Sequence, residues 1–304
     1  MPYSTFALPS RKHLHAVVLV VTLSVAALAQ TVTQASCTYR FFPTQFFTPP
    51  LSQYGQFFPS GINDFGTVVG GAFQTGFIRG ANGGFAFPKG TSSLQDRNDE
   101  GVTIGYNAKN APIILSNRKI IPLSVMTQKG TLRGVGLAVS RINDWDSIVG
   151  WYGDNAGITH GFKRWANGHG FSLNFPAHFT QINSGTFPTG TNDKGVIVGF
   201  TQIPYHAFVY YKGVWTTVRY PNANSTLLWG ISNAGVIVGS ASFANGTSFG
   251  FLYKDGKFEK IIPPATTGPG VGSNVIAISL RQGLILGFAD LKNSPRQGFI
   301  ANCQ

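Results

Sequence analysis

The sequence predicts an all-β protein, a six-bladed β-propeller in which a strand from the N-terminal region completes the last blade. Three observations support this prediction. A turn followed by a short apolar strand recurs six times, and no long stretch has helical periodicity. The last repeat also lacks a strand that is present in surplus near the start of the chain. Many short apolar runs separated by Gly, Asn, Asp and Pro are typical of all-β folds.

The start of the chain has the three parts of a secretory signal peptide. Arg11 and Lys12 precede a mostly apolar run over 16–29, which ends in Ala-Leu-Ala. This run is shorter than the ~20 apolar residues that a transmembrane helix needs. We therefore expect cleavage after Ala29, which leaves a single repeat domain over 30–304 that is secreted or periplasmic and has no membrane span.

A lipid anchor at Cys37 is the less favoured alternative. The residues before it, Gln34-Ala35-Ser36, have a weak likeness to the lipidation signal of bacterial lipoproteins. Gln34 stands where that signal has Leu, and Cys37 lies well past the apolar run.

The repeat is defined by a glycine that ends a β-branched strand, as in INDFGTVVG over 62–70. The six terminal glycines are Gly70, Gly105, Gly150, Gly199, Gly239 and Gly287. They are 35 to 49 residues apart, about 43 on average. Propeller blades of four strands span ~40–50 residues. Each repeat therefore predicts one blade.

The Asn-Asp-x-Gly part of the repeat predicts a tight turn, because short polar side chains bond to nearby backbone and Gly takes the positive φ. This structural role in the turn is expected for Asp64, Asp99, Asp144 and Asp193. The glycine that ends the strand predicts a bulge or a close approach of another backbone. The sixth copy, LRQGLILG over 280–287, has lost the Asn-Asp pair.

Two more strands follow in each unit. The first opens with Gly-Phe in four of the six copies, at Gly76, Gly161, Gly250 and Gly298. The second ends in an apolar residue and Pro, at Pro88, Pro122, Pro176, Pro221 and Pro263.

These units resemble the extracellular repeats of the HAF family, which is found in exported bacterial proteins. The marks of that family are Asn-Asp-x-Gly-x-Ile-Val-Gly and Gly-Phe, and the resemblance covers about residues 38–303. It implies export and a repeat architecture. It implies no activity, substrate or catalytic residue.

Closure follows from counting strands. The sixth unit stops after its Gly-Phe strand, while a spare strand ending in Phe-Pro lies at 39–43. If this strand completes the last blade, it removes a free sheet edge. Cys37 and Cys303, the two cysteines of the chain, flank this joint. Export permits a disulfide between them, and their Cα atoms should then lie ~4.4–6.8 Å apart.

The charge of the chain bears on its partners. Without Arg11 and Lys12, 21 basic residues face 11 acidic ones, so the net charge is about +10. Such a field favours acidic partners, which include anionic polysaccharide and an envelope protein. The basic residues are scattered rather than clustered, which argues against nucleic acid. We expect a monomer.

Three patterns that suggest chemistry have a structural explanation instead. Gly-Thr-Ser-Phe-Gly over 246–250 matches a nucleophile elbow, but that elbow needs a strand-to-helix turn in an α/β fold. The repeated turn acids have no calcium-loop spacing. His160 and His206 occupy equivalent places before a strand, without Cys or acidic partners at metal-ligand spacing. We expect no catalytic, cofactor-binding or metal-binding residue and no cofactor.

Five tryptophans remain as candidates for stacking on sugar rings or for a partner interface: Trp145, Trp151, Trp165, Trp215 and Trp229. The leading hypothesis is an exported, non-catalytic binding or scaffold protein that contacts envelope polysaccharide or another protein through one propeller face. The alternative is a propeller enzyme, a glycosidase or lyase. That alternative requires two carboxylates or a His–Tyr pair outside the turns that converge in the central funnel.

Overall fold

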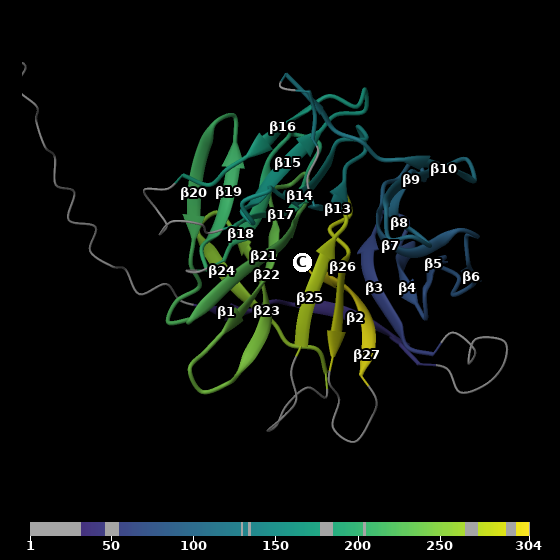
Figure 1. The fold of residues 1–304 in the computed structure, drawn as a ribbon. Coiled ribbons are helices and arrows are strands. Elements are labelled where there is room, and N and C mark those ends of the chain that lie inside the picture. Colours follow the sequence, from purple (N-terminus) through teal and green to yellow (C-terminus); the bar gives the residue numbers. More distant parts are fainter. Residues whose placement is uncertain are drawn as a thin grey trace, which may run out of the picture. The chain divides into compact units, whose positions relative to one another are not determined.

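The computed structural model describes residues 32–45, 55–128, 130–132, 135–176, 185–202, 205–264, 273–289 and 296–303. The predicted signal peptide lies outside these residues. The described chain forms six blade sheets that follow one another around a closed ring (Figure 1). Each has four antiparallel strands, and one of them carries a fifth, parallel strand at its edge. The fold is the predicted six-bladed β-propeller, with one repeat for each blade.

The strands of the first three blades are contiguous in sequence. The first blade consists of β3 (Phe57–Ile62), β4 (Val68–Ala72), β5 (Thr75–Arg79) and β6 (Phe85–Ala86). The second consists of β7 (Thr91–Arg97), β8 (Thr103–Asn107), β9 (Pro112–Ser116) and β10 (Lys119–Pro122). The third consists of β13 (Val135–Ile142), β14 (Ile148–Gly153), β15 (Thr159–Arg164) and β16 (Gly170–Leu173). A small hairpin precedes it, made of β11 (Met126–Thr127) and β12 (Gly130–Thr131).

The fourth blade is also contiguous in sequence, whereas the fifth and sixth each include a strand from the N-terminal segment. The fourth blade consists of β17 (Thr186–Thr191), β18 (Ile197–Thr201), β19 (Ala207–Tyr211) and β20 (Val214–Val218). The fifth consists of β21 (Ser225–Ile231), β22 (Ile237–Ser242), β23 (Ser248–Lys254) and β24 (Lys257–Ile261), with β1 (Thr33–Gln34) added at its edge. The sixth consists of β25 (Ser273–Ile278), β26 (Ile285–Ala289), β27 (Gln297–Cys303) and β2 (Cys37–Pro43).

Closure by the N-terminal strand is confirmed. β2 pairs antiparallel with β27 from Cys37 opposite Cys303 to Pro43 opposite Gln297, and the two cysteines form a disulfide. Their Cα atoms are 4.0 Å apart, slightly closer than expected, because the cysteines face each other directly on adjacent strands. The pairing of β1, parallel to β24, was not predicted. Residues 33–43 therefore bind two blades at once.

The repeated glycine and the repeated Phe are partners across one sheet. Gly70, Gly150, Gly199, Gly239 and Gly287 each lie opposite a Phe on the next strand, which follows Gly in four blades and Ala207 in the fourth blade. A Cβ on Gly199 would come within 2.2 Å of the Phe187 carbonyl oxygen and 2.6 Å of the Phe208 ring. The glycine is required because the buried ring of Phe208 lies over it. This explains why the two motifs occur together.

The hydrophobic core lies between neighbouring blades. At the closure, Phe57, Val68 and Phe77 of the first blade pack with Leu286 and Ile300 of the sixth. No helix among the described residues is long and apolar enough to cross a membrane.

Candidate functional site

The first strand of each blade lines a central channel, and the two ends of the channel differ. At one end, here called the Asn–Asp face, lie the turns that join the first and second strands and those that join the third and fourth. At the other end, the connection face, lie the segments from second to third strand and from blade to blade. The segment between the second and third blades differs, because Met126 within it pairs with His169 in a turn of the Asn–Asp face.

The Asn of each Asn-Asp turn makes the local hydrogen bond. Asn63 Oδ1 accepts from the Thr67 N–H over 3.0 Å, and Asn98, Asn143 and Asn192 accept in the same way four residues on. Ser232 Oγ replaces the Asn amide in the fifth blade.

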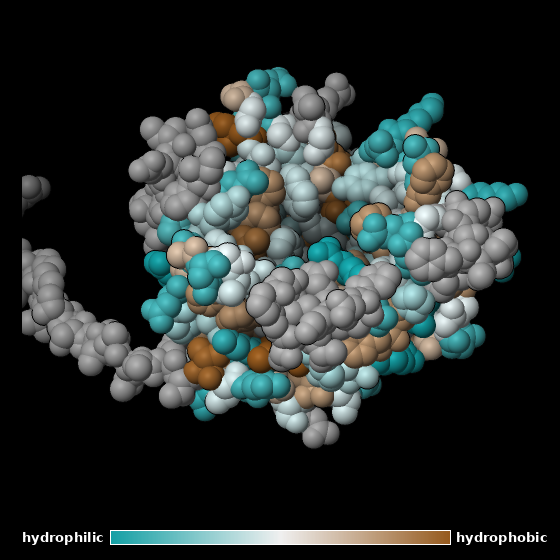
Figure 2. Space-filling view, turned by 90° about the horizontal axis from the view of Figure 1, so that it is seen from below, coloured by the Kyte–Doolittle hydropathy of each residue, from teal (hydrophilic) through white to brown (hydrophobic). Residues whose placement is uncertain are grey.

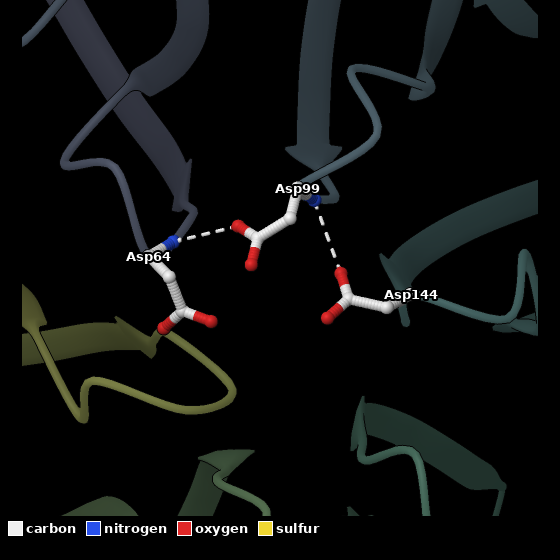
Figure 3. A group of neighbouring side chains, drawn as sticks. All are labelled: Asp64, Asp99 and Asp144. Carbon is white, nitrogen blue, oxygen red and sulfur yellow. Dashed lines mark hydrogen bonds between the residues drawn. The ribbon is translucent and has the colours of Figure 1, made fainter.

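The Asp of the turn instead bonds to the next blade. The N–H groups of Asp64 and Asp99 each donate over 3.0 Å to the carboxylate of the equivalent Asp one blade further on (Figure 3). The N–H of Asp144 donates to the Asp193 carboxylate over the same distance. Asp193 donates to Asn233 Oδ1, and the Asp64 carboxylate accepts from the backbone of Arg281 and Gln282. This belt of hydrogen bonds links all six blades. Our expectation that these Asp side chains bond to their own turn is corrected, since the Asn side chains fill that role.

The belt brings negative charges together. One carboxylate oxygen from each of Asp64, Asp99 and Asp144 lies within 4.8 Å of the others. Burial, and then a hydrogen bond with Asp64, raise the pKa of Asp99 to about 6. Burial also raises the pKa of Asp144, whose carboxylate lies 3.0 Å from the Arg281 guanidinium. Arg281 belongs to the sixth repeat, which has lost the Asn-Asp pair, so this repeat supplies a positive charge to the ring.

An acidic and a basic side chain fill the middle of the channel. Asp96 and Arg141 stand where the other first strands have Gly61, Gly190, Gly230 or Ala277. The Arg141 guanidinium donates to the carbonyl oxygens of Ser140 and Ile276, so it reaches from the third blade to the sixth, across the ring. Arg141 lines the cavities on both sides of it and so divides the channel.

The surroundings of Asp96 shift its pKa in opposite directions. Burial raises the pKa of Asp96 to about 6, while the Arg141 charge and the Ile142 N–H, which donates over 3.0 Å, lower it. Among the described residues, Asp96 is the acidic side chain outside the turns that lines the channel. It faces a guanidinium, so the acidic pair that the enzyme alternative requires is not formed here.

A funnel on the connection-face side of Arg141 is built from six equivalent bulges. Each first strand has a β-bulge at the same place, and the extra residues are Ser60, Gln95, Ser140, Thr189, Trp229 and Ile276. Bulges re-aim side chains, and all six of these residues line one cavity of about 230 Å³ together with Trp151. Hydroxyl, amide, indole and guanidinium groups thus meet in one place.

The tryptophans divide between the two ends of the channel. Trp151 and Trp229 line the funnel, and both are half-buried. Trp145 and Trp165 lie in turns of the Asn–Asp face, exposed by 70% and 43%. Trp215 packs against Phe175, Phe208 and Tyr210.

Trp151 and Trp229 were candidates from the sequence, whereas the polar funnel residues Gln95, Ser140 and Thr189 were not, because the repeat motifs do not include the first strands. The bulges of the first strands appear only in the pairing between strands and leave no pattern in the sequence. The position after each repeat glycine did carry a sequence pattern that pointed to the funnel. It holds an aromatic residue in four of six units: Tyr106, Trp151, Phe200 and Phe288.

The remaining candidate residues lie elsewhere. Residues 246–250 form the turn into β23 and the start of that strand, with no helix after them. His160 contacts Asp154 over 3.0 Å and Asn174 over 2.7 Å, and His206 stacks on Phe175. None of these residues lines the channel.

The two faces carry opposite charge. Seven acidic residues lie in the turns of the Asn–Asp face against four basic ones. The described segments of the connection face contain one acidic residue, Asp154, and four basic ones: Lys89, Lys109, Arg219 and Arg296. Hydrophobic residues on the surface seen in Figure 2 form small groups separated by hydrophilic ones.

Comparisons with known proteins show the fold. No protein-family model matches the chain, and no curated protein sequence does. A catalytically inactive virginiamycin B lyase from Staphylococcus aureus has a TM-score of 0.51 at 12% identity, over 88% of this chain and 99% of that one. A gluconolactonase from Xanthomonas campestris has a TM-score of 0.50 at 11% identity, over 90% and 98%. Aleuria aurantia lectin has a TM-score of 0.44 at 13% identity, over 79% and 88%.

The two of these structures with a TM-score of 0.50 or more have different functions. A lyase and a lactonase share the propeller with this chain, so the likeness establishes its architecture and leaves its function to the site.

Proposed function

We propose that this protein is an exported, non-catalytic binding protein that holds an acidic polysaccharide of the cell envelope in the funnel of its connection face. The observation that carries the proposal is the funnel itself. Six bulges direct one side chain per blade into a single cavity, where Trp151 and Trp229 stand beside polar groups.

The composition of the funnel suits a sugar. Aromatic rings offer flat apolar surface for the C–H faces of a pyranose, and nearby polar groups fix its orientation. The Gln95 side chain has no hydrogen-bond partner among the described residues, so its amide is available to a ligand. The bonds from Ser140 Oγ to the Pro188 carbonyl and from Thr189 Oγ1 to the Leu228 carbonyl hold the wall rigid.

Charge favours an acidic ligand. The described segments of the connection face carry an excess of basic residues, and clefts edged by one sign of charge attract ligands of the other. The Asn–Asp face carries the opposite excess and would repel the same polymer.

Export and HAF-family membership are part of this proposal. The disulfide between Cys37 and Cys303 supports an oxidising compartment, and the signal-like start of the chain supports secretion to the periplasm or beyond. The repeat residues quoted above support the family.

The test compares binding of alginate and polygalacturonate, which carry carboxylates, with binding of neutral dextran. Affinity electrophoresis at low and physiological salt should show retardation by the acidic polymers, weaker at higher salt. Trp229→Leu and Trp151→Leu should each weaken binding about tenfold, as for residues at the centre of an interface. Trp145→Leu, on the other face, should leave it unchanged.

Two results would overturn the proposal. One is equal retardation by dextran and the acidic polymers, or by none of them. The other is a loss with Trp145→Leu as large as that with Trp229→Leu. Gln95→Ala serves as a second funnel variant if a tryptophan variant loses stability.

A further inference from the structure

The wall of the funnel continues outward as a series of aromatic rings. Trp151 meets Phe187 edge-on at a centroid distance of 5.5 Å, and Phe187 stacks on Phe200 at 5.3 Å. Phe200 in turn contacts Trp229 at 5.6 Å and Tyr205 at 6.4 Å. Phe200 therefore joins the funnel to a residue on the rim.

These rings belong to three neighbouring blades and come together through two strand positions. Trp151 and Phe200 follow the repeat glycine of their blades, and Phe187 lies directly opposite Phe200 on the adjacent strand. Tyr205 lies in the connection after β18 and is 50% exposed. The other four rings are half-buried, so each keeps part of its surface accessible.

The funnel is small compared with the length of this aromatic surface. Its volume of about 230 Å³ is below the ~300–1,000 Å³ of a typical small-molecule site. A ligand confined to it would leave Phe200 and Tyr205 without a contact.

We infer that the ligand is an oligosaccharide segment, with one sugar in the funnel between Trp151 and Trp229 and further sugars crossing Phe200 to stack on Tyr205. This inference rests on the function proposed above and adds the size of the ligand and its direction across the fourth blade. Tyr205 is then an outer contact that only a ligand longer than one sugar can reach.

The test measures the affinity of galacturonate oligomers of increasing length by calorimetry, with galacturonic acid as the shortest. Affinity should rise with length and then level off once the chain covers Tyr205. Tyr205→Ala should weaken the longer oligomers about tenfold and leave the monomer unchanged, whereas Trp229→Leu should weaken every length. Tyr211→Ala is the matched control, because Tyr211 is 41% exposed on the same blade but at the end of β19 toward the Asn–Asp face.

The outcomes separate the two proposals. If Tyr205→Ala weakens all lengths equally, or none, while Trp229→Leu still weakens every length, the outer contact is wrong and the funnel site stands. If no length binds, or Trp229→Leu has no effect on any, both are wrong. Tyr205→Phe keeps the ring and should restore the affinity for long oligomers, which a merely structural role for the hydroxyl group would not do.

Discussion

The backbone N–H of Asp64 donates to the carboxylate of Asp99, 35 residues later and one blade further round the ring. The same link appears between Asp193 and Asn233, where an amide oxygen replaces the carboxylate at 2.9 Å. The link therefore needs an acceptor oxygen but no charge. This distinction allows the hydrogen bond and the charge to be tested separately.

Removing the acceptor should destabilise the fold. Changing Asp64, Asp99, Asp144 or Asp193 to Ala deletes at least one inter-blade hydrogen bond, and each should lower the free energy of unfolding by about 0.5–2 kcal/mol. Urea unfolding measures this, with Glu100→Ala as the control because Glu100 is exposed and makes no hydrogen bond among the described residues. A loss of ligand binding without a loss of stability would contradict the structural role.

Removing the charge of Asp99 while keeping an acceptor oxygen should raise the free energy of unfolding at neutral pH. The pKa of Asp99 is raised to about 6, so its proton is held more tightly in the folded state than in the unfolded one. The stability that this group contributes is present below its unfolded pKa of about 4 and is lost as the pH rises through about 6.

Asp99→Asn should therefore melt slightly above the wild type at pH 7, by no more than about 2 °C because the group is partly solvated, and at the same temperature at pH 4. Thermal unfolding at the two pH values checks this. A variant that is less stable at pH 7 would show that the carboxylate charge strengthens the belt.

The repeat glycine should not tolerate a methyl group. In Gly70→Ala the new Cβ would lie 2.1 Å from the Phe58 carbonyl oxygen and 2.7 Å from the Phe77 ring. We expect a loss of about 1–3 kcal/mol in the free energy of unfolding, as for other overpacked cores. The adjacent Gly71→Ala meets the Ser93 Cβ at 3.2 Å and should cost less. Equal losses at the two positions would contradict the cross-strand packing of glycine and Phe.

Reduction of the disulfide should loosen the last blade first. In the chain-entropy model a cross-link across a loop of this length contributes roughly 5 kcal/mol, so the melting temperature should fall on adding a reductant. Hydrogen exchange should show early opening of β2 and β27, with the second to fourth blades protected for longer. Deleting residues 38–43 should do more damage, because it leaves the β27 edge unpaired and prone to aggregate. Uniform opening of all blades would contradict this order.

The six blades and their closure were predictable because each depends on local patterns that repeat. A turn needs Asn and Gly, a buried strand needs Val and Ile, and a missing strand shows up as a gap in the count. The role of the Asp residues was not predictable in this way, since Asp64 and Asp99 are neighbours in the ring and not in the sequence. The same holds for Arg141 and Ile276, which meet across the channel.

The funnel was not predictable from the sequence either, because it also depends on how the strands pair. Trp151 and Trp229 have no common motif, and they line the same funnel because one follows a repeat glycine while the other is the extra residue of a bulge. A sequence repeat indicates which positions are equivalent. Which of them points inward depends on the bulge, a property of the pairing between strands.

The pairing of residues 33–43 with the last two blades delays closure of the ring until late in synthesis. Residues 33–43 are synthesised before the first blade, yet their partners in β24 and β27 come near the end of translation. The sixth blade therefore stays incomplete while the earlier blades fold, and the nascent chain must hold its first strands without a partner through that time. Contacts this distant in sequence form slowly, so closure of the ring is the step at which a chaperone or a disulfide-forming enzyme would act most usefully.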